Sequence, residues 1–415
     1  MVKSVACGIG IVLVALCLSV HAASQAVSPV VHLGIDRLEQ GGFKGLDGKK
    51  VGLVVNLASV DSQGRSTIDV LRNALGARLI ALFGPEHGLD GKARAGRYVK
   101  SYTDKRTGLP VYSLYDRTRK PTPQMLQGLD CLVYDVQDLG CRSYTYVSTL
   151  GLVMEAAAEL NKEVIVLDRP NPLGGLRMEG PRLNPKFRTF VGMFDIPYVY
   201  GLTIGELAQW INKHHLKKSC KLTVMPMDGW RREMTWQDTG LRWLPTSPNI
   251  PRVESVFGYV ATGLLGEIGV VNGANDLLPF ELIAAEGLDG AGFSSKMNSF
   301  GFRGVQFEPH SFRPSSGKYR SVRFSGARLK IDPKAEANLT AIPFYAFPLL
   351  KKRFPKRKFF ANRTKEPVIM FDKINGGDYP RLALQREESP EKIIASWTPG
   401  VKKWSAERQP FLMYP

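Results

Sequence analysis

The chain has 415 residues, enough for two or three domains with buried cores, so a small scaffold held together by disulfides or a metal is excluded. Its formal charge of +18 comes from basic residues spread along the chain without a recognition-helix or zinc-finger pattern, so we expect an anionic environment but no nucleic-acid partner. Of the five cysteines, only Cys131, Cys141 and Cys220 lie beyond the N-terminal segment, which leaves room for at most one disulfide.

The N-terminal segment has the composition of a secretory signal. One basic residue, Lys3, precedes an apolar run over residues 5–20 and the small residues Ala22 and Ala23. This run is too short for a lasting membrane span, and no later run approaches the roughly 20 apolar residues that a bilayer requires. We therefore expect a signal peptide at residues 1–23, cleaved near Ala22 and Ala23, and an exported protein, periplasmic or secreted, without stable membrane insertion.

Short apolar runs alternate with amphipathic segments between residues 49 and 225. This alternation is typical of strands that are buried on both faces and joined by helices. The predicted strands cover residues 50–56, 77–83, 110–115, 130–136, 163–167 and 221–225. The predicted helices cover residues 66–75, 122–129, 148–161 and 203–213. The pattern predicts an α/β domain with a doubly wound, mainly parallel sheet.

The second part of the chain has weaker periodicity and more proline. A helical pattern at residues 252–265 is followed by an irregular stretch. Further on we predict helices mixed with short strands at 304–308, 321–324 and 328–331. We therefore divide the chain into an α/β catalytic domain at residues 30–290 and a smaller α+β domain at residues 291–415.

Polar and ionisable side chains follow the predicted parallel strands. In an open parallel sheet, ligands bind outside the carboxyl ends of the strands, where loops and helix N-termini converge. The second predicted strand runs into FGPEHGLDG, the fourth into YDVQDLGCRSYTY and the fifth into LDRPNPLGG. The candidate site residues at this edge are Asn56, Glu86, His87, Asp138, Arg142, Tyr144, Tyr146, Asp168, Arg169 and Asn171.

Glu86 is the strongest catalytic candidate. Pro85 restricts the backbone before it, and Gly88 and Gly91 allow the loop to approach a ligand closely. A carboxyl group in such a place can be tuned toward a general acid, and His87 would orient it or contact the substrate. The alternatives are that Glu86 is only an exposed carboxylate on a loop and that His87 has only a structural role.

Asp138 and Asp168 each have two interpretations. One of them would supply the second carboxylate that most glycoside hydrolases use, or both would cap helices and pair with Arg142 and Arg169.

Aromatic and loop residues complete the candidate set. Tyr144 and Tyr146 would stack on a sugar ring or pack against the rim of the sheet. Asn249 lies in the segment LPTSPNIP, which is either a rigid binding loop or a connector between domains.

Several cofactor-dependent classes lack their sequence signatures. No predicted strand is followed by a Gly-rich dinucleotide fingerprint, and the sequence has no Gly-Lys-Ser/Thr phosphate loop, no HExxH motif and no GxSxG motif. Its histidines and cysteines are not spaced as metal ligands. We therefore expect neither a cofactor nor a metal.

Six motifs occur in order along nearly the whole chain: FGPEHGLDG, YDVQDLGCRSYTY, VLDRPNPLGG, YGLTIGELA, LPTSPNIP and SPEKIIASW. Together they resemble the bacterial exo-β-N-acetylmuramidases. The resemblance implies a Rossmann-like domain with a smaller C-terminal domain. It also implies release of N-acetylmuramic acid from the non-reducing ends of peptidoglycan fragments, with the glutamate of the EHG motif, Glu86 here, as general acid and base.

The implied substrate carries a lactyl carboxylate, which Arg142 or Arg169 would hold in a two-pronged hydrogen bond. The chain departs from the family pattern at Gly84, where many relatives have Ser, and in residues 266–290, which lack an aromatic residue expected near Glu286. Retaining, inverting and substrate-assisted mechanisms all remain open. Two other functions fit the sequence: a non-catalytic muropeptide-binding protein and a hydrolase of another exported anionic glycan.

Overall fold

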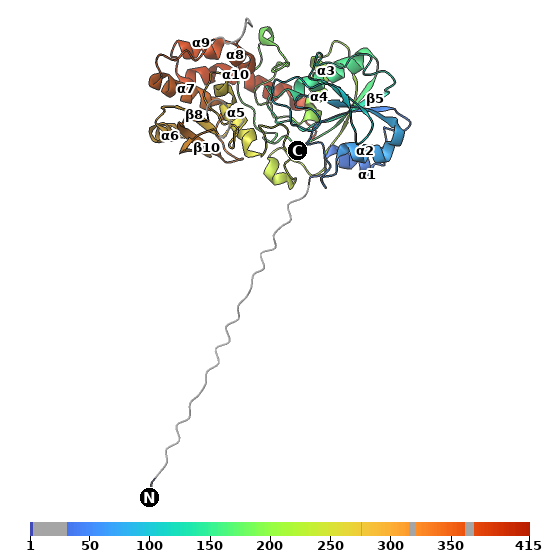
Figure 1. Cartoon of the computed structure of the whole chain (residues 1–415), viewed down its shortest axis with the longest axis horizontal. Helices are drawn as coiled ribbons and strands as arrows, with labels where there is room; N and C mark the ends of the chain where they lie inside the picture. The colour runs from blue at the N-terminus through green and yellow to red at the C-terminus, as the bar shows by residue number, and fades with distance from the viewer. Residues whose placement is uncertain (3–30, 275, 315–319, 362–368) are drawn as a thin grey trace.

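The computed structural model describes residues 1–2, 31–274, 276–314, 320–361 and 369–415. The predicted signal peptide therefore lies outside the described residues, except for its first two. The described chain contains a seven-stranded and a three-stranded sheet, and Figure 1 shows them in separate halves of the molecule. No helix in these ranges is long and apolar enough to cross a membrane.

The seven-stranded sheet has the order β3-β4-β2-β1-β5-β6-β7, and all neighbours are parallel except β3 and β4. Its strands are β1 Val51–Val55, β2 Leu79–Gly84, β3 Tyr102–Thr103, β4 Pro110–Ser113, β5 Cys131–Asp135, β6 Glu163–Leu167 and β7 Lys221–Met225. The strand order reverses between β1 and β5, and such a switch point opens a crevice at the carboxyl ends of the strands. The predicted doubly wound α/β fold is confirmed.

Helices cover both faces of this sheet, with α1 and α2 on one face and α3 and α4 on the other (Figure 1). Along β5, Cys131 and Val133 pack in the core with α1 and α2, whereas Leu132 and Tyr134 pack in the core with α3 and α4. Burial on both faces explains why the strands are continuous apolar runs. The helices of this half are α1 Gly34–Gln40, α2 Thr67–Leu75, α3 Tyr146–Glu159 and α4 Ile204–His214, with short 3-10 helices at Gly76–Arg78, Pro185–Phe187 and Trp236–Thr239.

Two predicted helices of this half have different outcomes. At the start of α4, the Thr203 hydroxyl accepts a hydrogen bond from the Glu206 N–H, and the Glu206 side chain accepts one from the Thr203 N–H. This reciprocal cap is the one that the sequence pattern indicates. The helix predicted at residues 122–129 is wrong, because these residues form turns and Gly128 has a φ of 77°, which interrupts a helix.

The second half packs a three-stranded antiparallel sheet, in the order β8-β10-β9, against helices. Its strands are β8 Leu282–Glu286, β9 Val305–Phe312 and β10 Phe324–Ile331. Its helices are α5 Glu254–Gly266, α6 Gly290–Asn298, α7 Ile342–Arg353, α8 Met370–Asn375, α9 Tyr379–Gln385 and α10 Pro390–Glu407, with 3-10 helices at Leu339–Ala341 and Gln409–Phe411. The smaller C-terminal α+β part predicted from the sequence is thus present.

Strand β8 lies in the stretch that we expected to be irregular, and it pairs with β10 along its whole length. Residues 328–331 form a strand as predicted, within β10. The strand predicted at residues 321–324 is wrong except for its last residue, because β10 begins at Phe324 and continues without a break. Gly326 makes this pairing possible, since a Cβ at that position would lie 2.0 Å from the Ile283 carbonyl oxygen. The domain division predicted at residue 290 stays a prediction, and β8 precedes it in the chain.

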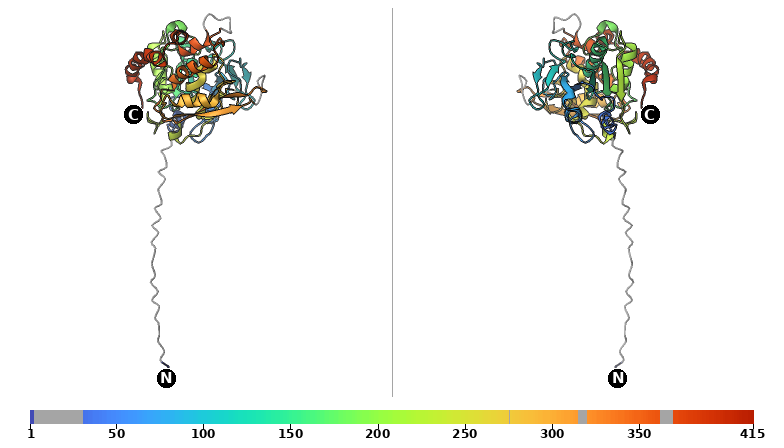
Figure 2. Two further views of the ribbon diagram at one scale, coloured as in Figure 1. Left: turned by 90° about the vertical axis from the view of Figure 1, so that its left-hand side faces the viewer. Right: turned by 90° about the vertical axis from the view of Figure 1, so that its right-hand side faces the viewer.

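The last residues of the chain return to the first half and form what we call the C-terminal strap, residues 412–415. The Tyr414 hydroxyl donates to Asp168 Oδ2 at 2.6 Å and accepts from the Met227 N–H at 3.0 Å. The Pro415 carbonyl accepts from the Arg232 N–H at 2.9 Å. In both views of Figure 2 the C-terminus lies beside the dark red C-terminal helix at the edge of the molecule. The strap therefore joins the end of the second half to the α/β sheet.

The cysteines beyond the N-terminal segment do not form a disulfide. Cys131, Cys141 and Cys220 are free and buried. Burial raises the pKa of the Cys131 and Cys220 thiols to about 11, so neither is a reactive thiolate at neutral pH.

Candidate active site

Glu86 lies on a loop that leaves the carboxyl end of β2 and folds back on itself. His87 has a φ of 73° and Gly88 a φ of 76°, so the chain reverses directly after Glu86. The Gly88 N–H donates to the Pro85 carbonyl at 3.0 Å, and His87 Nδ1 lies 2.7 Å from the Ala93 carbonyl oxygen. His87 thus helps to hold the loop closed, and because it also lines the cavity beside Glu86, its contact with the substrate stays a prediction.

The Glu86 carboxylate is buried, with 7% of the residue exposed, and both of its oxygens accept hydrogen bonds. Oε1 accepts from the Gly96 N–H at 2.8 Å, and Oε2 accepts from the Thr145 hydroxyl at 2.7 Å. The Tyr115 pKa is raised, first by burial and then by the charge of Glu86. Loops after β2, β4 and β5 therefore meet at this carboxylate, as the strand order predicts.

A cavity of about 1090 Å³ opens next to Glu86 and His87. The α/β half contributes the loop residues to its wall, and the second half contributes α5, the segment after it, the ends of β9 and β10, and α8. The site therefore lies between the two halves of the molecule. The charged and polar residues among its described lining are Glu86, His87, Arg94, Arg97, Tyr115, Ser143, Tyr144, Thr145, Tyr198, Ser247, Asn249, Tyr259, Glu267, Asn272 and Asp276.

The two candidate tyrosines occupy different places. Their rings meet edge to face at 4.7 Å, and both hydroxyls donate to Thr246, that of Tyr144 to the side chain at 2.8 Å and that of Tyr146 to the carbonyl at 2.6 Å. Tyr144 lines the cavity, whereas Tyr146 is packed beneath it and donates to the Glu86 carbonyl at 3.3 Å. Asn249 also lines the cavity, on the loop that carries Thr246.

Asn56 and Asn171 shape the backbone around the switch point. The Asn56 Oδ1 atom accepts from the Ala58 N–H at 3.1 Å, and its amide donates to the Gln137 carbonyl. The Asn171 amide donates to the Leu202 carbonyl at 2.9 Å. Both side chains are buried and neither lines the cavity beside Glu86, so the structure gives them structural contacts rather than the substrate contacts that we predicted.

Asp138 is buried away from Glu86. It lines a separate void of about 10 Å³ and accepts hydrogen bonds from the Tyr200 hydroxyl and the Gly140 N–H. Burial raises its pKa to about 7, although these hydrogen bonds oppose the shift. The structure therefore does not bring Asp138 to the cavity, where a catalytic partner of Glu86 would have to lie.

Arg142 does not have the free guanidinium that a substrate clamp requires. The side chain is fully buried, and it donates to the carbonyls of Pro181 and Ile196 at 2.6 Å, of Asn375 at 2.9 Å and of Ile374 at 3.1 Å. It thus joins the α/β half to α8. The expected two-pronged contact with a substrate carboxylate is replaced by contacts with the backbone.

Asp168 and Arg169 are also held by internal partners. Arg169 is buried and forms two hydrogen bonds with Asp135, at 2.5 and 2.8 Å. Asp168 Oδ1 accepts from the Gly205 N–H in the first turn of α4, whose N-cap is Thr203, and burial raises the pKa of Asp168. The ion pairs that we considered between the two candidate aspartates and Arg142 or Arg169 do not form, because Arg169 pairs with Asp135.

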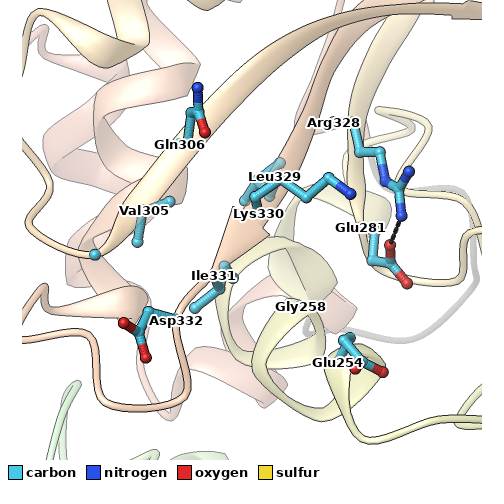
Figure 3. Close-up of a pocket in the computed structure, with 11 residues that line it drawn as sticks. Glu254, Gly258, Glu281, Val305, Gln306, Arg328, Leu329, Lys330, Ile331 and Asp332 are labelled. Atoms are coloured by element: carbon cyan, nitrogen blue, oxygen red, sulfur yellow. Dashed lines mark hydrogen bonds and ion pairs between the residues drawn. The ribbon is translucent and has the colours of Figure 1, made fainter. Parts of the chain in front are cut away.

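A second cavity of about 530 Å³ lies in the second half, between α5 and the strands β9 and β10 (Figure 3). Its buried carboxylate, Glu281, is held by Arg328 at 3.0 Å and by Arg252 Nε at 2.8 Å. Glu254 lines the same space from the first turn of α5. Since Glu281 is committed to two arginines, this cavity lacks the arrangement of donors that surrounds Glu86.

Within the described ranges, no three His, Cys, Asp or Glu side chains are grouped to hold a metal ion. Sequence reasoning missed Tyr115, Thr145, Arg94 and Arg97 as site residues. Two of them could have been found from the sequence, because Tyr115 ends a predicted strand and Thr145 lies within the YDVQDLGCRSYTY motif. The two arginines follow the EHG motif in a stretch without periodicity.

The sequence and the structure match proteins that are already known. The N-terminal family model of the exo-β-N-acetylmuramidase NamZ matches residues 51–254, and the C-terminal model matches residues 257–414. The peptidoglycan β-N-acetylmuramidase NamZ of Bacillus subtilis is 39% identical over 389 residues, which cover 94% of this chain and 92% of the relative.

Two crystal structures of DUF1343 family proteins from Bacteroides fragilis share the fold. One has a TM-score of 0.86 and 42% identity, covering 93% of this chain and 99% of its own. The other has a TM-score of 0.70 and 26% identity, with 92% and 99% covered. These matches, with the two family models, show that the chain belongs to the exo-β-N-acetylmuramidase NamZ family.

Proposed function

We propose that this protein is a peptidoglycan exo-β-N-acetylmuramidase that releases N-acetylmuramic acid from the non-reducing ends of peptidoglycan fragments, with Glu86 as its catalytic acid and base. Family membership supports the reaction. The observation that carries the assignment of Glu86 is its place at the wall of a cavity of about 1090 Å³, where an N–H and a hydroxyl fix both carboxylate oxygens.

The chemistry requires a proton donor at the glycosidic oxygen. A carboxyl group held by Gly96 and Thr145 has few accessible orientations, so it can meet a bound sugar without reorganising. Protonation of the leaving oxygen by such a group typically contributes a factor of about 10² to 10⁴ to the rate. Once the leaving sugar has departed, the same carboxylate can take a proton from the attacking water.

The remaining groups of the cavity suit a saccharide. Tyr144 offers an aromatic ring and Asn249 an amide within the same lining. Such mixtures of ring faces and hydrogen-bonding groups bind sugars, which have apolar faces and polar edges. We also propose that the protein acts outside the cytoplasm, because its first residues resemble a secretory signal and its substrate is a cell-wall polymer.

The test uses the protein without residues 1–23 and a chromogenic β-N-acetylmuramic acid glycoside, with the β-N-acetylglucosamine glycoside for comparison. We expect release of the chromophore from the muramic acid glycoside, and a loss of at least about 100-fold in kcat in Glu86→Gln. Glu254→Gln is the matched control, because Glu254 is an exposed glutamate of the second cavity. Full activity of Glu86→Gln would exclude this residue as the acid, and binding of muropeptide without any release of sugar would indicate a binding protein.

A further inference from the structure

The proposed substrate carries a carboxylate, and the arginines expected to bind it are unavailable. Arg142 is surrounded by backbone carbonyls and Arg169 is paired with Asp135. The lactyl carboxylate belongs to the sugar whose glycosidic oxygen Glu86 protonates, so it must lie within about one sugar ring of this acid. The cation that recognises it therefore has to be sought in the lining of the same cavity.

Arg94 and Arg97 are the only Lys or Arg side chains among the described residues that line this cavity. Both are exposed, and neither forms an ion pair or a side-chain hydrogen bond within the described part of the chain. The histidine of the lining, His87, directs Nδ1 to the Ala93 carbonyl. The two guanidinium groups are thus the available positive charges beside Glu86.

The backbone fixes where these arginines stand relative to the acid. The Arg97 N–H donates to the Arg94 carbonyl at 3.1 Å, so the two residues face each other across a tight turn. Gly96, inside this turn, donates its N–H to Glu86 Oε1 at 2.8 Å. The turn that presents the two arginines is therefore the same turn that holds the catalytic carboxylate, and the two functions share one loop.

We propose that Arg94 and Arg97 bind the lactyl carboxylate of the muramic acid residue and thereby select muramic acid over glucosamine at the cleaved end. This inference rests on the proposed function. Guanidinium groups bind carboxylates with charge-assisted and often two-pronged hydrogen bonds. Because N-acetylglucosamine lacks the lactyl group, a site that depends on this contact discriminates between two sugars that are otherwise alike.

The first experiment compares two substrates and two proteins. The substrates are the chromogenic muramic acid glycoside and its analogue in which the lactyl carboxylate is an amide. We expect the wild type to lose about 10- to 100-fold in kcat/KM on the amide, and Arg94→Gln/Arg97→Gln to show a similarly low kcat/KM on both substrates. Arg94→Lys/Arg97→Lys should recover part of the preference for the acid, and Arg242→Gln, an exposed arginine outside the cavity lining, should behave as the wild type.

A second measurement does not depend on turnover. Calorimetric titration of Glu86→Gln with free N-acetylmuramic acid should give an affinity that falls about 10- to 100-fold when both arginines are also replaced. A double arginine variant that keeps the preference for the acid, or that binds the sugar as tightly, would overturn the proposal. Absence of hydrolysis by the wild type would refute the proposed function alone, because the binding comparison still reports on the two arginines.

Discussion

Replacing Arg142 with methionine should destabilise the protein without affecting recognition of the substrate carboxylate. The substitution keeps most of the buried volume but removes every donor of the guanidinium. Four carbonyls then lose this donor. That of Ile196 keeps a hydrogen bond from the Leu183 N–H at 3.3 Å, whereas that of Asn375 is buried and depends on Arg142. A buried carbonyl without a donor costs about 1–3 kcal/mol, so that of Asn375 alone lowers the free energy of unfolding by about this amount. The carbonyls of Pro181 and Ile374 are only partly buried and regain water.

The change also has a structural consequence at the active site. Two of the four carbonyls belong to Ile374 and Asn375, at the end of α8, and α8 contributes Met370 and Ile374 to the cavity wall. Loss of the guanidinium loosens this wall. We therefore expect kcat/KM of Arg142→Met to fall by the same factor on the muramic acid glycoside and on its amide analogue.

Urea unfolding followed by tryptophan fluorescence measures the change in stability, and kinetics on the folded fraction measure the change in activity. Arg242→Met serves as the control, since an exposed substitution of this kind changes stability by less than about 0.5 kcal/mol. The reasoning would be refuted if stability were unchanged and kcat/KM fell only on the muramic acid glycoside. Arg142 would then be the residue that binds the substrate carboxylate.

Two further predictions concern Asp138 and Thr145. Burial raises the Asp138 pKa from 3.8 to about 7, so between these values the folded protein holds a proton that the unfolded chain has released. The wild-type free energy of unfolding should therefore fall relative to Asp138→Asn as the pH rises from about 5 to 7, by on the order of 1 kcal/mol per pH unit, and a constant difference would contradict this. Thr145→Val removes a donor to Glu86 Oε2 and should lower kcat/KM about tenfold, whereas Thr145→Ser keeps the hydroxyl; equal activity of the two variants would rule out this anchoring role.

The α/β sheet was predictable because its strands are buried on both faces. β6, with the sequence EVIVL, is buried at every position and lies at the predicted residues, and its neighbour β5 differs from the prediction only at its ends. The second half gave weaker signals. β10 contains Gly326, which suggests a break in a strand, yet the glycine is needed for close pairing with β8. In the sequence, a glycine that breaks a strand looks the same as one that allows close pairing.

The location of Glu86 could also be predicted, because the rule for the carboxyl ends of parallel strands depends only on the order of elements. The roles of the arginines around the site could not be predicted from the sequence. Arg142 donates to carbonyls that lie 232 and 233 residues further along the chain, so its environment is set by a distant helix. Arg94 and Arg97 are the opposite case, since their sequence showed no sign of a site. They lie in an aperiodic loop, and only the folded turn around Gly96 brings them to the cavity.

The C-terminal strap makes the packing of the α/β half depend on residues that lie far from it along the chain. Tyr414 packs in the same core as α1 and α2, and its hydroxyl is one of the donors that satisfy Asp168. The parts of a chain usually fold in the order in which they are synthesised, but here the α/β half packs around Tyr414, which is made long after its own strands. The α/β half therefore cannot complete this part of its core until Tyr414 has been synthesised.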